Sequence, residues 1–405
     1  MSAPSALSAA ETTPPGPAAG AETGATWDLR SAQSLLELAK STQTQGADID
    51  AAVVSTLESA ISLHEQAAID LAASRLFVSL AVMEDRGFLP ASARRNWHLE
   101  DDAFDAARAN AAITDAAATQ NVGDILKIFE PPHPQFQSLA HMLSTLPADA
   151  EEKRRLLEVN MERWRWMPRN LGETYILVNI PAYEIRIFKK DQQVYRGRVI
   201  IGAQKSRTPI FETEATGVVI NPSWFVPASI VRESVGALLD NKPKTASRLG
   251  FVRSEDGAVR QKPGPDNALG QAKLVMPNDY SVFIHGTNHP ELFKRKGRAL
   301  SHGCIRTENV LDFVQHLLPP VWRQDAATLI AAAGTTVTLD FSEPIPIYLV
   351  YFTAYADDAG NVSYYPDIYG LDRDLDQWRS KPERAVDSEA RLTPDSNRKS
   401  VFCAF

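Results

Sequence analysis

The run Tyr175-Ile176-Leu177-Val178-Asn179-Ile180 is followed by Tyr183-Glu184-Ile185-Arg186-Ile187-Phe188, and with these two runs the pattern of the chain changes. Both are rich in β-branched and aromatic residues, which is typical of strands separated by a short turn. A third run of the same kind covers residues 194–201. The sequence therefore predicts that a mostly-β domain begins near residue 170.

More elements of this β domain follow in the chain, and the predicted fold class is α+β. A polar stretch from Pro222 to Lys273 contains Lys262-Pro263-Gly264-Pro265 and is too long for a turn. It is interpreted as a capping or lid insertion (222–273), with a surface loop of no special role as the alternative. The domain is expected over 170–345, with a C-terminal extension at 346–405. Strands are predicted at 217–220, 281–285, 335–341 and 347–355, and helices at 228–239 and 309–318.

Residues 27–169 show a helical pattern and are predicted to form a helical scaffold domain. Leu35, Leu36, Leu38 and Ala39 recur at helical spacing, and the Ala- and Leu-rich run 64–83 is followed by the stop signal Asp85-Arg86-Gly87. Residues 1–26 have the composition of a disordered leader. Further helices are predicted at 101–118, 121–129 and 150–166, with a break at Glu130–Pro134.

Composition excludes several classes of protein. The hydrophobic fraction of 44% and the charged fraction of 23% are those of a folded globular chain. A net charge of −8 without a strong basic cluster argues against nucleic-acid binding. The chain has no run of about 18 apolar residues and no N-terminal export signal, so an integral membrane protein is not expected. A monomer is favoured.

The chemistry centres on Ser301-His302-Gly303-Cys304-Ile305-Arg306. A cysteine nucleophile needs a nearby base, and His285, at the end of a predicted strand, is the candidate. The carbonyl of Gly286 can orient the imidazole ring, and Gly303 permits a tight turn whose N–H groups converge on an oxyanion. The other cysteine, Cys403, is interpreted as an incidental thiol, which could pair with Cys304 only by inactivating it. The pattern indicates acyl transfer.

Three alternatives use the same residues. Isolated buried cysteines are usually inert, but three of the eight histidines fall between positions 285 and 302. A serine nucleophile at Ser301 lacks the Gly-x-Ser-x-Gly surroundings of a nucleophile elbow. A zinc site is disfavoured because Gly286 and Pro290 make a helix across this stretch improbable. The ligand types for such a site would be His285, His289, His302 and Cys304.

The sequence resembles the L,D-transpeptidase family, which has a YkuD-type catalytic domain. The resemblance rests on His285, a fifteen-residue spacer and then Ser-His-Gly-Cys-Ile-Arg at 301–306. It covers roughly residues 130 to 370 and is greatest for the large Gram-negative members. Those members usually carry a peptidoglycan-binding module between the scaffold and the catalytic domain. In this chain the segment from His133 to Asn160 is too short to contain such a module. Other similar segments are Asn160–Trp166, Val178–Tyr183, Asn221–Pro227 and His289–Leu300.

The resemblance implies roles for individual residues. Cys304 would be the nucleophile and His285 its base, with the Gly286 carbonyl orienting the ring and N–H groups at Gly303 and Cys304 forming the oxyanion hole. His302 would line this site or hold the loop. No cofactor and no metal are implied. Candidate substrate contacts are Ser301, His302, Arg306, Trp224 and Phe283.

The implied substrates are peptidoglycan stem peptides. Cys304 would attack the carbonyl of the third stem residue, diaminopimelate, of a tetrapeptide donor, release D-alanine and form a thioester. An acceptor amine would then give a 3-3 or 1-3 cross-link, a protein attachment or, with water, carboxypeptidase activity. This chemistry implies the periplasm, with the export signal removed. A non-catalytic cell-wall-binding scaffold remains the alternative from another class.

Overall fold

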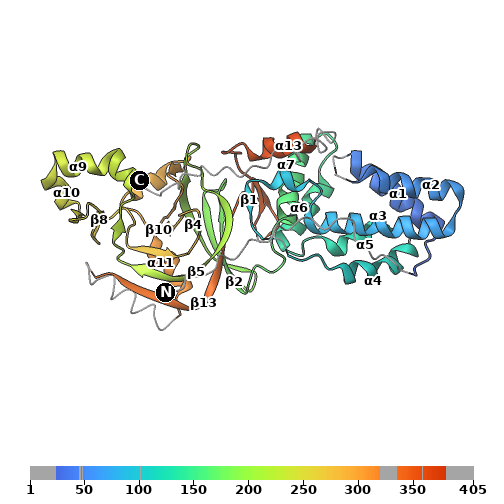
Figure 1. The fold of residues 1–405 in the computed structure, drawn as a ribbon, viewed down its shortest axis with the longest axis horizontal. Helices are drawn as coiled ribbons and strands as arrows, with labels where there is room; N and C mark the ends of the chain where they lie inside the picture. The colour runs from blue at the N-terminus through green and yellow to red at the C-terminus, as the bar shows by residue number, and fades with distance from the viewer. Residues whose placement is uncertain are drawn as a thin grey trace, which may run out of the picture. The chain divides into compact units, whose positions relative to one another are not determined.

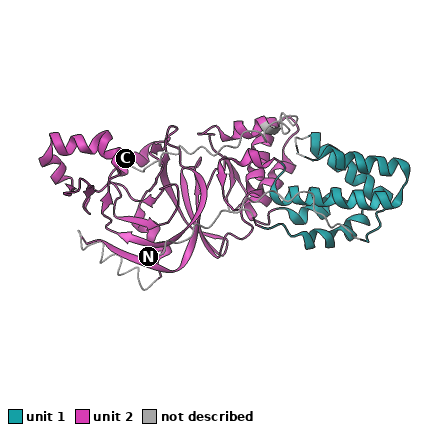
Figure 2. Cartoon of the chain, viewed as in Figure 1, with its two compact units in different colours: residues 1–88, 103–130 teal, residues 89–102, 131–405 magenta. Residues whose placement is uncertain are grey.

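The structure is a computed structural model that describes residues 24–44, 47, 49–100, 102–319, 335–357 and 359–379. The chain divides into two compact units, residues 1–88 with 103–130 and residues 89–102 with 131–405 (Figure 2). Most of the predicted leader and all of Cys403 lie outside the described residues.

The first unit is helical, as predicted. Asp50 caps the second helix by accepting a hydrogen bond from the Ala52 N–H, and Gly87 follows the third with φ 101°. The stretch 66–94 is long and apolar enough to cross a membrane, but Leu76 and Phe77 within it are fully buried, as in a core helix. The elements are α1 (Leu29–Thr44), α2 (Ala51–Leu63), α3 (Gln66–Arg86), α4 (Ala106–Ala117), α5 (Val122–Leu126) and η2 (Lys127–Phe129) (Figure 1).

Two further helices, α6 (Pro134–Thr145) and α7 (Glu151–Arg165), belong to the second unit. Helix α6 was not predicted, because the proline-rich segment before it was interpreted as a break. Pro134 instead occupies the first turn, where its missing N–H costs nothing. The indole ring of Trp164 stacks on Phe352 at 4.7 Å between ring centroids. The unit boundary therefore falls at Glu130 and differs from the expected position near residue 170.

The second unit is built on a closed sheet. Its strands follow the order β1-β5-β13-β2-β3-β4-β12-β10-β9, and β5 also pairs with β9, so no edge is left between these two strands. The strands before the insertion are β1 (Trp97–His98), β2 (Thr174–Asn179), β3 (Glu184–Lys189), β4 (Gln192–Gly202) and β5 (Ile210–Ile220). Those after it are β9 (Ala272–Val275), β10 (Ile284–His285), β11 (Ala299–Ser301), β12 (Ile305–Thr307) and β13 (Val337–Val350).

Helical pieces and a small hairpin complete this unit. The predicted strand 347–355 is divided between β13 and β14, and only the last two residues of the predicted strand 281–285 are paired. Ser281 has φ 54°, a left-handed conformation that interrupts a strand. The remaining elements are η1 (Ala91–Arg94), η4 (Pro290–Lys294), α11 (Val310–Leu317), β14 (Ala354–Ala356), β15 (Val362–Tyr364) and α13 (Leu371–Arg379).

The insertion between β5 and β9 forms a small subdomain with its own hydrophobic core. Trp224, Ile230 and Phe251 are buried together in it. Asn267 ties its ends by donating from Nδ2 to the carbonyl oxygens of Pro222 and Lys262. The elements are β6 (Trp224–Phe225), α8 (Ala228–Ile230), η3 (Val231–Val235), α9 (Gly236–Asn241), α10 (Pro243–Arg248), β7 (Phe251–Arg253) and β8 (Val259–Gln261).

Candidate active site

Strands β10 and β12 bring the candidate catalytic residues onto one face. They are parallel neighbours, with Ile284 opposite Ile305 and His285 opposite Arg306. Both isoleucines are fully buried in the core. Because side chains alternate along a strand, His285 and Arg306 lie on the face opposite to the isoleucines. Cys304 comes directly before β12, and its Sγ accepts a hydrogen bond from the N–H of Phe283, two residues before His285.

The loop before β12 is fixed by the side chain of Ser301. Its Oγ donates to the Cys304 carbonyl at 2.6 Å and accepts from the Gly303 N–H at 3.1 Å. Gly303 has φ 123°, which a residue with a side chain rarely adopts. The Gly303 N–H is thus used within the loop, which differs from the expectation that it faces an oxyanion. Ser301 is 3% exposed and supports the loop.

The sulfur of Cys304 lies in a polar backbone setting. The Phe283 N–H donates to Sγ at 3.1 Å, and the Ser281 carbonyl oxygen lies 4.0 Å from it. The residue is 2% exposed. A thiolate at this position is the nucleophile that attack on a carbonyl requires.

His285 is held by the backbone in the way the sequence suggested. Its Nδ1 lies 2.6 Å from the carbonyl oxygen of Gly286, which can only accept, so Nδ1 carries the proton. Burial, with a smaller contribution from Arg306, lowers the pKa of His285 to about 3. The imidazole is therefore neutral at physiological pH, and its Nε2 has the lone pair that a general base requires.

The buried histidines predict a pH dependence of stability. Burial lowers the pKa of His285 to about 3 and that of His133 to about 4. Below about pH 6.5 the unfolded chain therefore binds protons that the folded chain excludes. The free energy of unfolding should fall as the pH drops from 6.5 to 4.5, by up to about 1.4 kcal/mol per pH unit for each ring.

The substitution His285→Gln should remove one of these two contributions. The exposed His289 offers a matched position, and His289→Gln shows what the same substitution does outside the core. Urea unfolding of the second unit at pH 6.5, 5.5 and 4.5 measures the slope. Equal slopes for wild type and His285→Gln would contradict the burial of a neutral ring.

Gly286 is required by close packing behind the base. A Cβ atom at this position would lie 2.8 Å from Val310 Cγ1 and 3.2 Å from Gly270 Cα. Gly286→Ala should displace the carbonyl that orients His285 and slow acylation about tenfold to a hundredfold. Gly297, where an added Cβ meets nothing within 4 Å, is the control position. An unchanged acylation rate in Gly286→Ala would show that this carbonyl does not set the ring position.

Two cations share the face with the candidate pair. Arg306 is 6% exposed, and burial lowers its pKa to about 10. Lys273 lies opposite His285 across the β9–β10 pair, and its Nζ is 3.5 Å from the centre of the Phe283 ring. Burial also lowers the pKa of Lys273. Lys273 was not among the residues predicted from sequence, because only the strand pairing brings it to the site.

The other residues predicted to contact substrate differ in the surroundings of their side chains. His302 Nε2 lies 3.9 Å from a carboxylate oxygen of Glu233 in the insertion, so this loop faces the inserted subdomain. Phe283 is at the site through its N–H and its ring. Trp224 is 5% exposed and packs edge-on against Phe251 inside the subdomain, whereas its neighbour Phe225 is 73% exposed. Trp224, predicted as a substrate contact, is thus part of the hydrophobic core of the inserted subdomain.

The zinc alternative depended on a helix across His285 and His289, and the structure has none there. His285 ends strand β10, and His289 precedes the short 3-10 helix η4. Among the residues that the structure describes, no group of three or more His, Cys, Asp or Glu side chains is placed to hold a metal ion.

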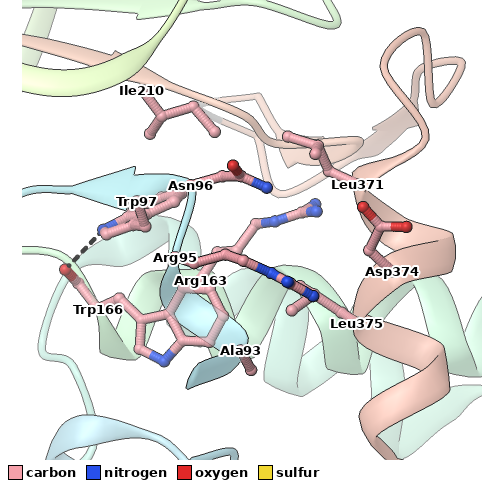
Figure 3. A pocket seen from close by; sticks show the side chains of 10 residues that line it. All are labelled: Ala93, Arg95, Asn96, Trp97, Arg163, Trp166, Ile210, Leu371, Asp374 and Leu375. Carbon is pink, nitrogen blue, oxygen red and sulfur yellow. Dashed lines mark hydrogen bonds between the residues drawn. The ribbon is translucent and has the colours of Figure 1, made fainter. Parts of the chain in front are cut away.

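A separate pocket of about 380 Å³, part of it open to solvent, contains none of the predicted site residues (Figure 3). Arg163 forms one wall of it, and helix α13 forms another through Leu371 and Leu375. The remaining lining residues are Ala93, Arg95, Asn96, Trp97, Trp166, Ile210 and Asp374.

Two stretches of the chain match known protein families. Residues 173–339 match the YkuD family model, described as an L,D-transpeptidase catalytic domain. The chain carries an L,D-transpeptidase catalytic domain. Residues 22–143 match the model of a Scaffold domain. The helical first part and the mostly-β L,D-transpeptidase domain thus both correspond to known families.

Individual proteins are similar to parts of this chain. A Haemophilus influenzae protein named "Putative L,D-transpeptidase" is 30% identical over 240 residues, which cover 54% of this chain and 48% of that protein. The chain thus spans about half the length of this curated relative. Among solved structures, the catalytic domain of an E. faecium L,D-transpeptidase acylated by ertapenem is 13% identical and covers 45% of this chain and 99% of its own, with a TM-score of 0.24. An L,D-transpeptidase from Mycobacterium smegmatis is 14% identical, covers 44% and 58%, and has a TM-score of 0.24.

Proposed function

We propose that this protein is a peptidoglycan L,D-transpeptidase that uses Cys304 as nucleophile and His285 as base. The observation that supports the proposal is the pairing of β10 with β12, which brings the end of β10 at His285 beside the start of β12 that follows Cys304, with His285 neutral and its Nδ1 bound to the Gly286 carbonyl. Nε2 is then the ring nitrogen that can accept the thiol proton.

The reaction follows from these groups. The thiolate of Cys304 attacks the carbonyl of the third residue, diaminopimelate, of a tetrapeptide stem, and the proton held by His285 passes to the departing D-alanine amine. The product is a thioester on Cys304. An acceptor amine attacks this thioester, His285 takes a proton from that amine, and the thiol is regenerated. Lys273 and Arg306 supply positive charge on the face where a stem carboxylate would approach.

The acceptor and the compartment are further parts of the proposal. A second stem peptide gives a 3-3 or a 1-3 cross-link, a protein amine gives attachment of the stem, and water gives carboxypeptidase activity. The substrate implies the periplasm. The insertion is proposed to act as a lid, because Glu233 within it approaches His302 of the catalytic loop.

The test is incubation of the reduced protein with disaccharide tetrapeptide, followed by mass spectrometry. We expect release of D-alanine, dimers whose tandem spectra identify the acceptor amine, and a carbapenem adduct on Cys304. Binding to cell wall without D-alanine release or adduct would instead support a non-catalytic scaffold. Recovery of the native protein in a cytosolic fraction would contradict the periplasmic location.

A further inference from the structure

Thr208, in the connection between β4 and β5, contacts the loop that carries the nucleophile. Its Oγ1 donates to the Gly303 carbonyl oxygen at 2.7 Å and accepts from the Gly202 N–H at 2.9 Å. The residue is 2% exposed, so water does not compete for these bonds. The direction of the Gly303 carbonyl is therefore fixed from outside the catalytic motif.

Fixing this carbonyl also fixes an N–H group. The Gly303 carbonyl and the Cys304 N–H belong to one planar peptide unit, which is trans, as are all the peptide bonds the structure describes. In a trans peptide the C=O and N–H point in opposite directions. The bond to Thr208 thus aims the Cys304 N–H away from Thr208, and this N–H is the donor that an oxyanion hole at Cys304 requires.

Tyr369 holds Thr208 in turn. Its hydroxyl donates to the Gly202 carbonyl at 2.6 Å and accepts from the Thr208 N–H at 3.2 Å. Tyr369 is 3% exposed, and burial raises its pKa to about 12, so it remains a donor across the working pH range. It lies beyond the stretch 173–339 that matches the catalytic domain.

The support continues into the C-terminal segment. The Tyr369 N–H donates to the Tyr351 hydroxyl at 2.8 Å, and that hydroxyl donates to Asp367 Oδ1 at 2.7 Å. The two tyrosine rings stack at 5.8 Å between centroids. The Arg163 guanidinium lies 5.1 Å from the centre of the Tyr351 ring. Each group is fixed on two sides, which gives Tyr369 a single orientation.

We propose that Tyr369 and Thr208 are positioning residues that aim the Cys304 N–H at the oxyanion formed during acylation. Neither touches the reacting atoms: Thr208 acts through the Gly303–Cys304 peptide, and Tyr369 acts through Thr208. The inference rests on the proposed function, since it requires a thioester at Cys304. In this proposal the segment after β13 supports the catalytic loop as well as packing against the domain.

The test compares Tyr369→Phe and Thr208→Val, which remove one hydroxyl each at nearly constant volume. In single-turnover acylation by a carbapenem, we expect each to lower the acylation rate about tenfold to a hundredfold, with the half-saturating concentration unchanged within about twofold. The infrared stretch of the thioester carbonyl should rise in frequency, because the hydrogen bond to it weakens. Thr208→Ser, which keeps the hydroxyl, should restore both values.

Tyr348→Phe is the matched control, since this tyrosine is 5% exposed and bonds only the Leu171 carbonyl among the described groups, at 3.4 Å. Rates and carbonyl stretches of Tyr369→Phe and Thr208→Val equal to those of Tyr348→Phe would overturn the proposal. So would equal losses in Thr208→Ser and Thr208→Val. Absence of a Cys304 adduct in the wild type would instead overturn the proposed function, so the two failures are distinguishable.

Discussion

Cys304→Ala is expected to abolish D-alanine release and dimer formation, with a loss of about four to six orders of magnitude. The physical reason is that the substitution removes the sulfur atom on which the thioester forms. Sγ accepts the Phe283 N–H at 3.1 Å, and the site places Arg306 on the same face, so the environment suits a thiolate. Alanine removes this nucleophile and little volume.

The measurement needs reducing conditions, because only the free thiolate of Cys304 is a nucleophile. Mass spectrometry of the carbapenem adduct and chromatography of the dimers are the two readouts. Cys403→Ser is the matched control and should retain full activity in reductant. D-alanine release by Cys304→Ala at a rate near that of the wild type would refute the mechanism.

The substitution His285→Gln tests the role of the base, separately from that of the nucleophile, in the same assay. Glutamine keeps a polar side chain but cannot accept the thiol proton, so acylation should slow by about two to four orders of magnitude. The loss should shrink as the pH rises, because hydroxide then deprotonates the thiol without the ring. A loss that stays the same from pH 7 to pH 9 would show that His285 has a structural role only.

Residues that are close in sequence could be predicted for this site. The hexapeptide from Ser301 to Arg306 contains the nucleophile and its loop, and His285 ends a recognisable apolar run. The orientation of the imidazole by Gly286 was predicted because it involves the next residue. Such local geometry depends on backbone rules that hold in any fold.

The other residues of the site could not be predicted, because they are brought there by contacts between segments that are far apart in the sequence. Lys273 reaches the site only because β9 pairs with β10, and Tyr369 reaches Thr208 across 161 residues of sequence. Trp224, predicted as a substrate contact, is buried in a core that the insertion forms on its own. Pro134 was interpreted as a break, although at the first turn of a helix it is favourable. The positions of Lys273, Tyr369 and Trp224 depend on tertiary packing, which no local pattern records, whereas Pro134 was a local signal that was misinterpreted.

Asp372→Asn is expected to lower the free energy of unfolding of the second unit by about 3–5 kcal/mol, or its midpoint by about 10 °C. Arg163 Nη1 lies 2.5 Å from Asp372 Oδ1, and the two side chains are only 2% and 7% exposed. The substitution leaves the Arg163 charge buried without its counter-ion. In Asp240→Asn, at the exposed pair Arg253–Asp240, the change should stay below about 1 kcal/mol.

The double substitution Arg163→Met with Asp372→Leu decides what this ion pair contributes. Arg163 Nη2 and Asp372 Oδ2 are buried and have no hydrogen-bond partner among the described residues, so the desolvation of both groups is only partly offset. Two apolar side chains of similar volume should therefore restore most of the stability lost in Asp372→Asn. Thermal unfolding followed by near-UV circular dichroism measures both variants. If the double variant is as unstable as the single one, the pair stabilises the fold through its geometry, and α13 depends on it for its position beside Tyr369.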